Sequence, residues 1–135
     1  MPESLDEKYQ ALSDYRLKRA KELIDVSEEL LENNHLKDSI NRSYYAMFSA
    51  LKSVLALDGF DSKKHFGVIS EFRKSYIKTG KLPEEYSKYI GIAFEIRNSS
   101  DYDDMYIVAR EDAVQQLEHA KELVEAIDGF IHLIL

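Results

Sequence analysis

Apolar residues recur every three or four positions through most of this chain, which is the spacing of helices that bury one face. The first stretch predicts a helix from about Asp14 to Asn33, with Ser13 or Asp14 as its N-cap. A second predicts a helix from about Leu36 to Leu57, and the short link makes the two helices antiparallel neighbours. Their apolar stripes consist of Leu17, Ala20, Ile24, Ser27 and Leu31, then of Ile40, Tyr44, Met47, Phe48, Leu51, Val54 and Leu55.

Three further helices are predicted in the second half of the chain. One runs from an N-cap at Ser62 to about Thr79, another begins near Pro83, and the last begins near Arg110. The apolar stretch 130–135 is expected to close the core, and its alternative role is a dimer surface. With two prolines and five glycines to interrupt it, the sequence predicts one all-α domain over residues 1–135. We expect an up-and-down bundle of four to five antiparallel helices with its core at about residues 14–130.

Composition narrows the class of protein. The chain has 135 residues, 44% of them hydrophobic and 32% charged, as in an ordinary globular domain. Cysteine is absent, which excludes disulfides, thiolate metal sites and a cysteine nucleophile. A polar start and the lack of an apolar run of about 20 residues predict a cytoplasmic protein with no membrane segment. No phosphate loop, dinucleotide fingerprint or metal-pair spacing is found, so neither a cofactor nor a metal is expected.

Charge is distributed unevenly along the chain. The net charge of −7 argues against non-specific nucleic-acid binding over the whole surface. Residues 63–97 nevertheless carry 8 basic and 4 acidic side chains, whereas residues 98–135 carry 2 and 9. The basic segment ends at Arg97, and we expect it to provide a local face that binds anions.

Arg97 opens the passage with the strongest functional signal. It is followed by an amide, two hydroxyls and three carboxylates around Tyr102, and such short polar side chains favour helix ends. We therefore expect Arg97 in the last helical turn, with a polar shelf after it that suits a phosphate or a partner chain. The alternative interpretation is a capped helix with a solvated turn.

Other candidate phosphate ligands lie earlier in the chain. Arg42 lies on a helical turn whose other residues are expected to pack in the core, so its charge needs solvent or an acidic partner. Lys64 and His65 stand where a helix starts, and the free amides of a helix start favour anions. The alternative for this pair is an exposed histidine beside solvated lysines. Of the adjacent tyrosines Tyr44 and Tyr45, one can face the core while the other reaches a neighbouring element.

Several motifs taken together resemble the HEPN superfamily of small helical domains, with a likeness from about Tyr15 to Phe130. The similarity is to a branch with a Tyr-Tyr-Ala-x-Phe helix and an Arg-x-x-x-Asp-Tyr signature. The motifs that carry it are Tyr15–Leu17, Asn41–Phe48, Lys64–Val68, Lys78–Pro83 and Arg97–Tyr102.

The resemblance implies a helical homodimer that places the signature arginines of both chains in one cleft. It also implies a minimal nucleotidyltransferase as partner in a toxin–antitoxin-type pair. Active relatives are metal-independent endoribonucleases with the pattern Arg-Asn-x-x-x-His. Arg97 and Asn98 match this pattern, but Tyr102 stands where the histidine is expected.

This departure matters for the chemistry. RNA cleavage needs a base for the ribose 2′-hydroxyl and a cation for the charge that develops on phosphorus. Arg97 can supply the cation, but tyrosine is a poorer base than histidine at neutral pH. Asp101 is a candidate base, or it orients Tyr102.

Three hypotheses of function follow. The first is a HEPN subunit that binds a nucleotide or RNA phosphate and works with a nucleotidyltransferase. The second is an endoribonuclease toxin that uses Arg97, Asn98, Asp101 and Tyr102. The third is a non-catalytic bundle that only binds other proteins.

Overall fold

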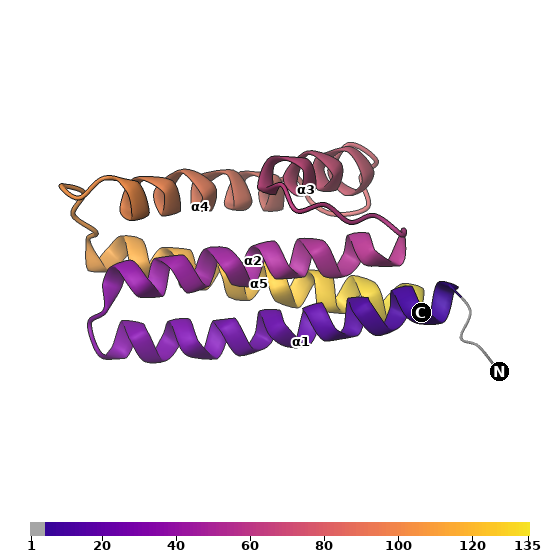
Figure 1. Ribbon diagram of the computed structural model, residues 1–135, viewed down its shortest axis with the longest axis horizontal. Coiled ribbons are helices and arrows are strands. Elements are labelled where there is room, and N and C mark those ends of the chain that lie inside the picture. The colour runs from indigo at the N-terminus through magenta and orange to yellow at the C-terminus, as the bar shows by residue number, and fades with distance from the viewer. Residues whose placement is uncertain (1–4) are drawn as a thin grey trace.

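The computed structural model describes residues 5–135, and within this range the chain forms α-helices, one π-helical turn and no strand. The elements are α1 (Leu5–Glu32), α2 (Leu36–Leu57), α3 (His65–Phe72), the π-helical turn η1 (Arg73–Ile77), α4 (Glu85–Tyr102) and α5 (Arg110–Ile134). The four long helices run in alternating directions (Figure 1). The all-α, up-and-down bundle predicted from the sequence is therefore confirmed.

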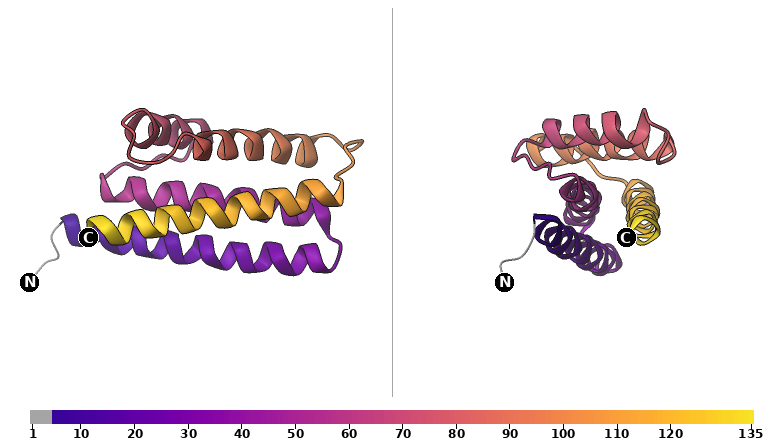
Figure 2. Two further views of the ribbon diagram at one scale, coloured as in Figure 1. Left: turned by 180° about the vertical axis from the view of Figure 1, so that it is seen from behind. Right: turned by 90° about the vertical axis from the view of Figure 1, so that its right-hand side faces the viewer.

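The helices form a group of three with a layer on top. Viewed along the bundle, α1, α2 and α5 form a triangle, and α3 and α4 lie over α2 and α5 (Figure 2). The central helix is α2, which packs against α1, α3, α4 and α5. None of the helices within residues 5–135 is long and apolar enough to cross a membrane.

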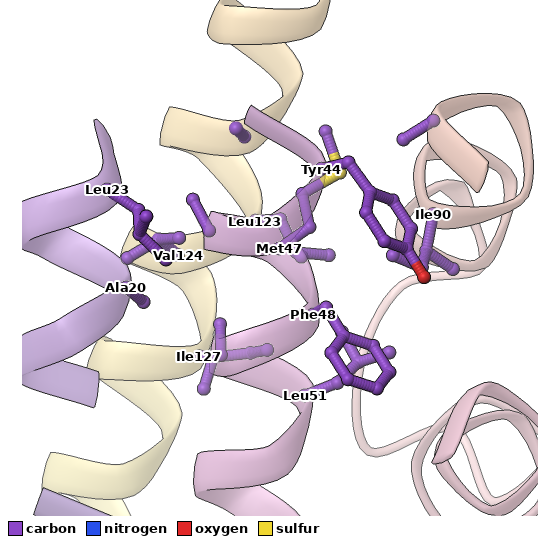
Figure 3. Close-up of a cluster of buried hydrophobic side chains, with 14 of the residues drawn as sticks. Ala20, Leu23, Tyr44, Met47, Phe48, Leu51, Ile90, Leu123, Val124 and Ile127 are labelled. Atoms are coloured by element: carbon purple, nitrogen blue, oxygen red, sulfur yellow. The ribbon is translucent and has the colours of Figure 1, made fainter. Parts of the chain in front are cut away.

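The core is built around one face of α2. Figure 3 shows Tyr44, Met47 and Leu51 of α2 between side chains of α1, α4 and α5. All three are fully buried, and burying a side chain of this size stabilises the fold by about 1.5–3 kcal/mol. The side chains that face them are Ala20 and Leu23 of α1, Ile90 of α4, and Leu123, Val124 and Ile127 of α5.

Buried hydroxyls connect α1 to α2. Ser27 Oγ lies 2.8 Å from Ser43 Oγ and donates to the carbonyl oxygen of Ser39 at 2.8 Å. Ser39 Oγ donates in return to the carbonyl oxygen of Ser27 at 2.9 Å. Because small side chains let the backbones approach and each hydroxyl is bonded, this network fixes the register of the two helices.

The predicted start of the first helix is wrong. α1 begins at Leu5, nine residues earlier than Asp14, and Ser13 is a buried position inside the helix rather than its cap. Residues 5–13 contain neither glycine nor proline, so nothing stops the helix. The extension also packs against the α2–α3 turn, because a Cβ at Gly59 would lie 3.0 Å from the Tyr9 ring.

The predicted bounds of the second helix are confirmed, since α2 spans Leu36–Leu57. Asn34 adopts a positive φ of 62°, which lets the chain reverse within three residues. The N-cap of α3 is Lys64 rather than Ser62, whose hydroxyl instead accepts a hydrogen bond from the Lys64 amide. Pro83 lies just before α4, which begins at Glu85.

Two expectations about helix ends are also corrected. α4 continues through the polar residues to Tyr102, so Arg97 is not in its last turn and the shelf after it is helical. The C-terminal stretch closes the core only as far as Ile131, which is 6% exposed. The apolar side chains after it are 51–84% exposed; they are Leu133, Ile134 and Leu135.

Candidate functional site

The site is centred on the guanidinium group of Arg97, which extends from α4 toward α2. Its Nη2 donates to the Tyr45 hydroxyl at 2.7 Å, and its Nη1 donates to Asn98 Oδ1 at 3.0 Å. Its Nε lies 3.0 Å from Asp101 Oδ2, one helical turn further along α4. The helical extension of α4 makes this ion pair possible, because residues four apart lie on the same helix face.

Aromatic rings surround the same cation. The central carbon of the guanidinium lies 5.5 Å from the ring centroid of Tyr44, 5.3 Å from that of Tyr45 and 5.8 Å from that of Tyr102. These distances are within the range of cation–π attraction. The Arg97 side chain is only 13% exposed, so α2 and α4 hold its charge in one place.

Asp101 joins the site to a second cation on α2. Its Oδ2 accepts a hydrogen bond of 3.2 Å from Asn41 Nδ2, and Asn41 Oδ1 accepts one of 3.1 Å from Arg42. The Arg42 side chain is exposed. Arg97 and Arg42 are therefore linked through one carboxylate and one amide.

His65 lies on the other side of Tyr44. Its Nδ1 is 2.6 Å from the Tyr44 hydroxyl, and its ring stacks on Phe48 with the centroids 4.3 Å apart. Burial, with a further contribution from the positive charges of Arg97 and Lys52, holds the pKa of His65 below its usual 6.5. Burial also raises the pKa of Tyr44 far above its usual value. Both side chains are therefore neutral at pH 7.

The structure brings together most of the residues that the sequence singles out. Arg97, Asn98, Asp101 and Tyr102 form one cluster, and Arg42 joins it through Asn41. His65 joins it through the tyrosines of α2, with its ring centroid 5.8 Å from that of Tyr45. Lys64 has an exposed side chain that makes none of these contacts.

Sequence reasoning on the two tyrosines is confirmed. Tyr44 is fully buried in the core, whereas Tyr45 reaches α4 and accepts the hydrogen bond from Arg97. The sequence did not predict the hydrogen bond between Arg97 and Tyr45. It showed only that the two tyrosine rings point about 100° apart on a helix. The signal that was available is that a tyrosine on a helix face next to a core position needs a partner for its hydroxyl.

The cluster holds a guanidinium cation that is largely buried among protein side chains. Arg97 has five N–H groups; Asn98 and Tyr45 each accept one and Asp101 faces a third, so two have no acceptor within residues 5–135. Asp101 is 30% exposed and partly neutralises the charge. Within residues 5–135, no group of three or more histidine, aspartate or glutamate side chains could hold a metal ion.

The fold and this cluster define a small all-α domain with an arginine-centred site. The profile of the HEPN domain matches residues 13–130, and the chain belongs to this family.

Named relatives agree with this assignment. A UPF0332 protein of Thermotoga maritima is 32% identical over 118 residues, which cover 87% of this chain and 89% of that protein. A protein of Methanocaldococcus jannaschii named as a candidate toxin is 33% identical over 97 residues, covering 72% of this chain and 66% of that protein. A UPF0332 protein of Archaeoglobus fulgidus is 30% identical over 110 residues, covering 82% and 87% respectively.

Proposed function

We propose that this HEPN-domain protein works with a minimal nucleotidyltransferase in a toxin–antitoxin-type pair, and that its Arg97 site binds a phosphate of RNA or of a nucleotide. Three relatives that are named as candidate toxins support the pairing. The observation that carries the phosphate site is the positioned guanidinium of Arg97, held by Tyr45 and Asn98 and surrounded by three rings. Within the family, we assign the chain to the branch with the Arg-x-x-x-Asp-Tyr signature.

A binding assay tests the phosphate site. We expect Arg97→Ala to weaken binding of fluorescently labelled RNA or AMP at least tenfold, because a charge-assisted hydrogen bond is worth about 1.5–3 kcal/mol. Arg97→Lys should restore only part of the affinity, since lysine cannot make a bidentate contact. Lys88→Ala is the matched control, because Lys88 is an exposed cation on the same helix. Equal affinity of Arg97→Ala and wild type would contradict the proposal.

The functional unit is proposed to be a homodimer in which two copies of Arg97 share one cleft. Large side chains beyond Arg97 support this proposal, because Tyr102, Met105 and Ile107 are 77%, 86% and 88% exposed. Apolar surface of this kind marks interfaces. Light scattering should give a dimer for the wild type and a monomer for the double variant Met105→Asp, Ile107→Asp. A monomeric wild type would contradict the shared cleft.

The pairing is tested by co-expression. The chain is produced together with a minimal nucleotidyltransferase encoded in the neighbouring reading frame, and the two should copurify in a fixed ratio. Absence of such a neighbour, or failure of the two to copurify, would contradict the pairing while leaving the phosphate site intact.

The alternative function is a metal-independent endoribonuclease toxin. It is favoured by the names of the three relatives and by the placement of a carboxylate, Asp101, 3.0 Å from the Arg97 cation. Arg97 would stabilise the charge on phosphorus, with Asn98 as a polar ligand and Asp101 or Tyr102 as the group that takes the ribose proton. Induced expression should then arrest growth and leave cyclic-phosphate ends on RNA. A harmless protein and intact RNA would exclude this function.

A further inference from the structure

A second concentration of positive charge lies beside Tyr45, whose ring lines it. Between α1 and α2 there is an open groove of about 420 Å³, which we call the α1–α2 groove. Its volume lies in the range of ligand sites, at the lower end. Its lining contains four cations and three aromatic rings; they are Arg16, Arg19, Arg42, Lys52, Tyr15, Tyr45 and Phe48.

The helix register produces this arrangement. Arg16 and Arg19 are three residues apart on α1, and Arg42, Tyr45 and Lys52 follow at helical spacing on α2. Because α1 and α2 are antiparallel and adjacent, these two faces meet along one groove. α5 packs against both helices, so the groove opens on the side that α5 leaves free.

The groove keeps an excess of positive charge. Arg16 and Lys52 share the carboxylate of Asp61, at 3.1 Å and 3.7 Å. Arg19 pairs with Glu22 at 3.3 Å, with both side chains about half exposed. Arg42 has no carboxylate partner within residues 5–135, and its side chain donates to the neutral amide of Asn41. Four cations therefore face two carboxylates.

Tyr45 connects the groove to the Arg97 site. Its ring lines the groove, while its hydroxyl accepts the hydrogen bond from Arg97. Arg42 belongs to both places, because it lines the groove and is linked to Asp101 through Asn41. A linear polyanion that leaves Arg97 can therefore continue into the α1–α2 groove.

We propose that the α1–α2 groove binds single-stranded RNA, as an extension of the phosphate site at Arg97 on whose function this inference rests. Arg19 and Arg42 contact phosphates, and a base stacks on Tyr15, which is 68% exposed. Positively charged grooves with exposed aromatic rings are the usual platforms for single strands, because every base has a face that can stack. Arg16 and Lys52, tied to Asp61, set the shape of the groove.

The test measures fluorescence anisotropy of a labelled RNA of twelve nucleotides, with the full chain, between 50 and 200 mM salt. The double variant Arg19→Ala, Arg42→Ala should raise the Kd about tenfold or more. The slope of log Kd against the logarithm of salt concentration should be smaller by about 0.7 for each phosphate that the variant can no longer bind. Tyr15→Ala should raise the Kd about fivefold or more. The control is Lys18→Ala, Lys37→Ala, which removes two exposed cations from the same two helices but outside the groove. It should change the Kd less than twofold.

The outcomes separate this inference from the proposed function. If Arg97→Ala weakens RNA binding and the groove variants do not, the groove proposal is overturned and the phosphate site at Arg97 stands. If the groove variants weaken RNA binding and Arg97→Ala does not, the groove stands and the phosphate site fails. If the groove variants weaken binding of AMP but not of RNA, the groove is a mononucleotide site and the proposal is overturned. Circular dichroism of each variant verifies that the helices are intact.

Discussion

Replacing Asp101 by asparagine should change stability and anion binding in opposite directions. Asp101 is the carboxylate that faces Arg97, with 3.0 Å between Oδ2 and Nε, and it also accepts a hydrogen bond from Asn41. The asparagine side chain keeps the shape and an oxygen acceptor but removes the negative charge. Arg97, which is 13% exposed, then loses its charged partner while keeping Tyr45 and Asn98.

The size of each effect follows from this geometry. Two unit charges at 3.0 Å attract by about 5–6 kcal/mol at an effective dielectric of about 20, but desolvation offsets most of this. For a pair that is partly exposed, we expect a net loss of about 1 kcal/mol of unfolding free energy. If a phosphate bound to Arg97 lies about 6 Å from Asp101, each charge pair in water costs about 0.7 kcal/mol. Removing that repulsion should lower the Kd about threefold for each phosphate charge.

Urea unfolding and RNA anisotropy on the same samples measure both effects. The reasoning requires a lower urea midpoint together with a lower Kd. A variant that binds RNA more weakly than wild type would refute it, because Asp101 would then help to hold the ligand rather than compete with it. If the protein cleaves RNA with Asp101 as the base, cleavage should disappear in the variant while binding improves.

Three further changes test other parts of the molecule. Tyr45→Phe keeps the ring but removes the 2.7 Å hydrogen bond from Arg97, so urea unfolding should show a loss of about 1–2 kcal/mol. Gln116 is 1% exposed, and its side-chain amide has no hydrogen-bond partner within residues 5–135. Gln116→Leu should therefore raise the free energy of unfolding by about 1 kcal/mol. The control Gln115→Leu, at an exposed position, should change it by less than about 0.5 kcal/mol. Because the pKa of His65 is lowered on folding, the unfolded chain takes up a proton first, so stability should fall as the pH drops below about 6.5. His65→Phe should remove that part of the pH dependence in thermal unfolding, and an unchanged profile would contradict the assigned pKa direction.

Hydrophobic spacing predicted the helices well where it was strong and failed where helix ends depend on other parts of the chain. α2 was placed correctly because a dense apolar stripe lies between two short turns. The start of α1 was missed because residues 5–13 are mostly exposed and show no clear stripe, so only the packing of Tyr9 on Gly59 indicates a helix there. The end of α4 was missed because serine and asparagine favour helix ends in isolation, whereas here the Arg97–Asp101 pair stabilises another turn.

The candidate site could be predicted only in part for a related reason. Arg97, Asn98, Asp101 and Tyr102 are neighbours in sequence, so one motif contains them all. The hydrogen bond between Arg97 and Tyr45 joins residues 52 positions apart, and no local pattern encodes it. The α1–α2 groove is hidden in the sequence for the same reason, because its cations are spread over two helices and α1 also carries many acidic residues.

The acidic net charge and the basic groove can coexist in part because the carboxylates of α5 lie away from the groove. α5 is strongly acidic; its carboxylates are Glu111, Asp112, Glu118, Glu122, Glu125 and Asp128. This helix packs on the inner sides of α1 and α2, so its outer face points away from the groove. At about 0.1 M salt, where the screening length is about 10 Å, RNA in the groove is largely shielded from that face. At about 0.01 M salt the length is about 30 Å, and repulsion from α5 reaches the ligand. In a plot of the logarithm of RNA affinity against the logarithm of salt concentration, the slope should therefore become shallower below about 0.05 M salt. A slope that stays constant down to about 0.01 M would refute the claim that the acidic face of α5 lies away from the groove.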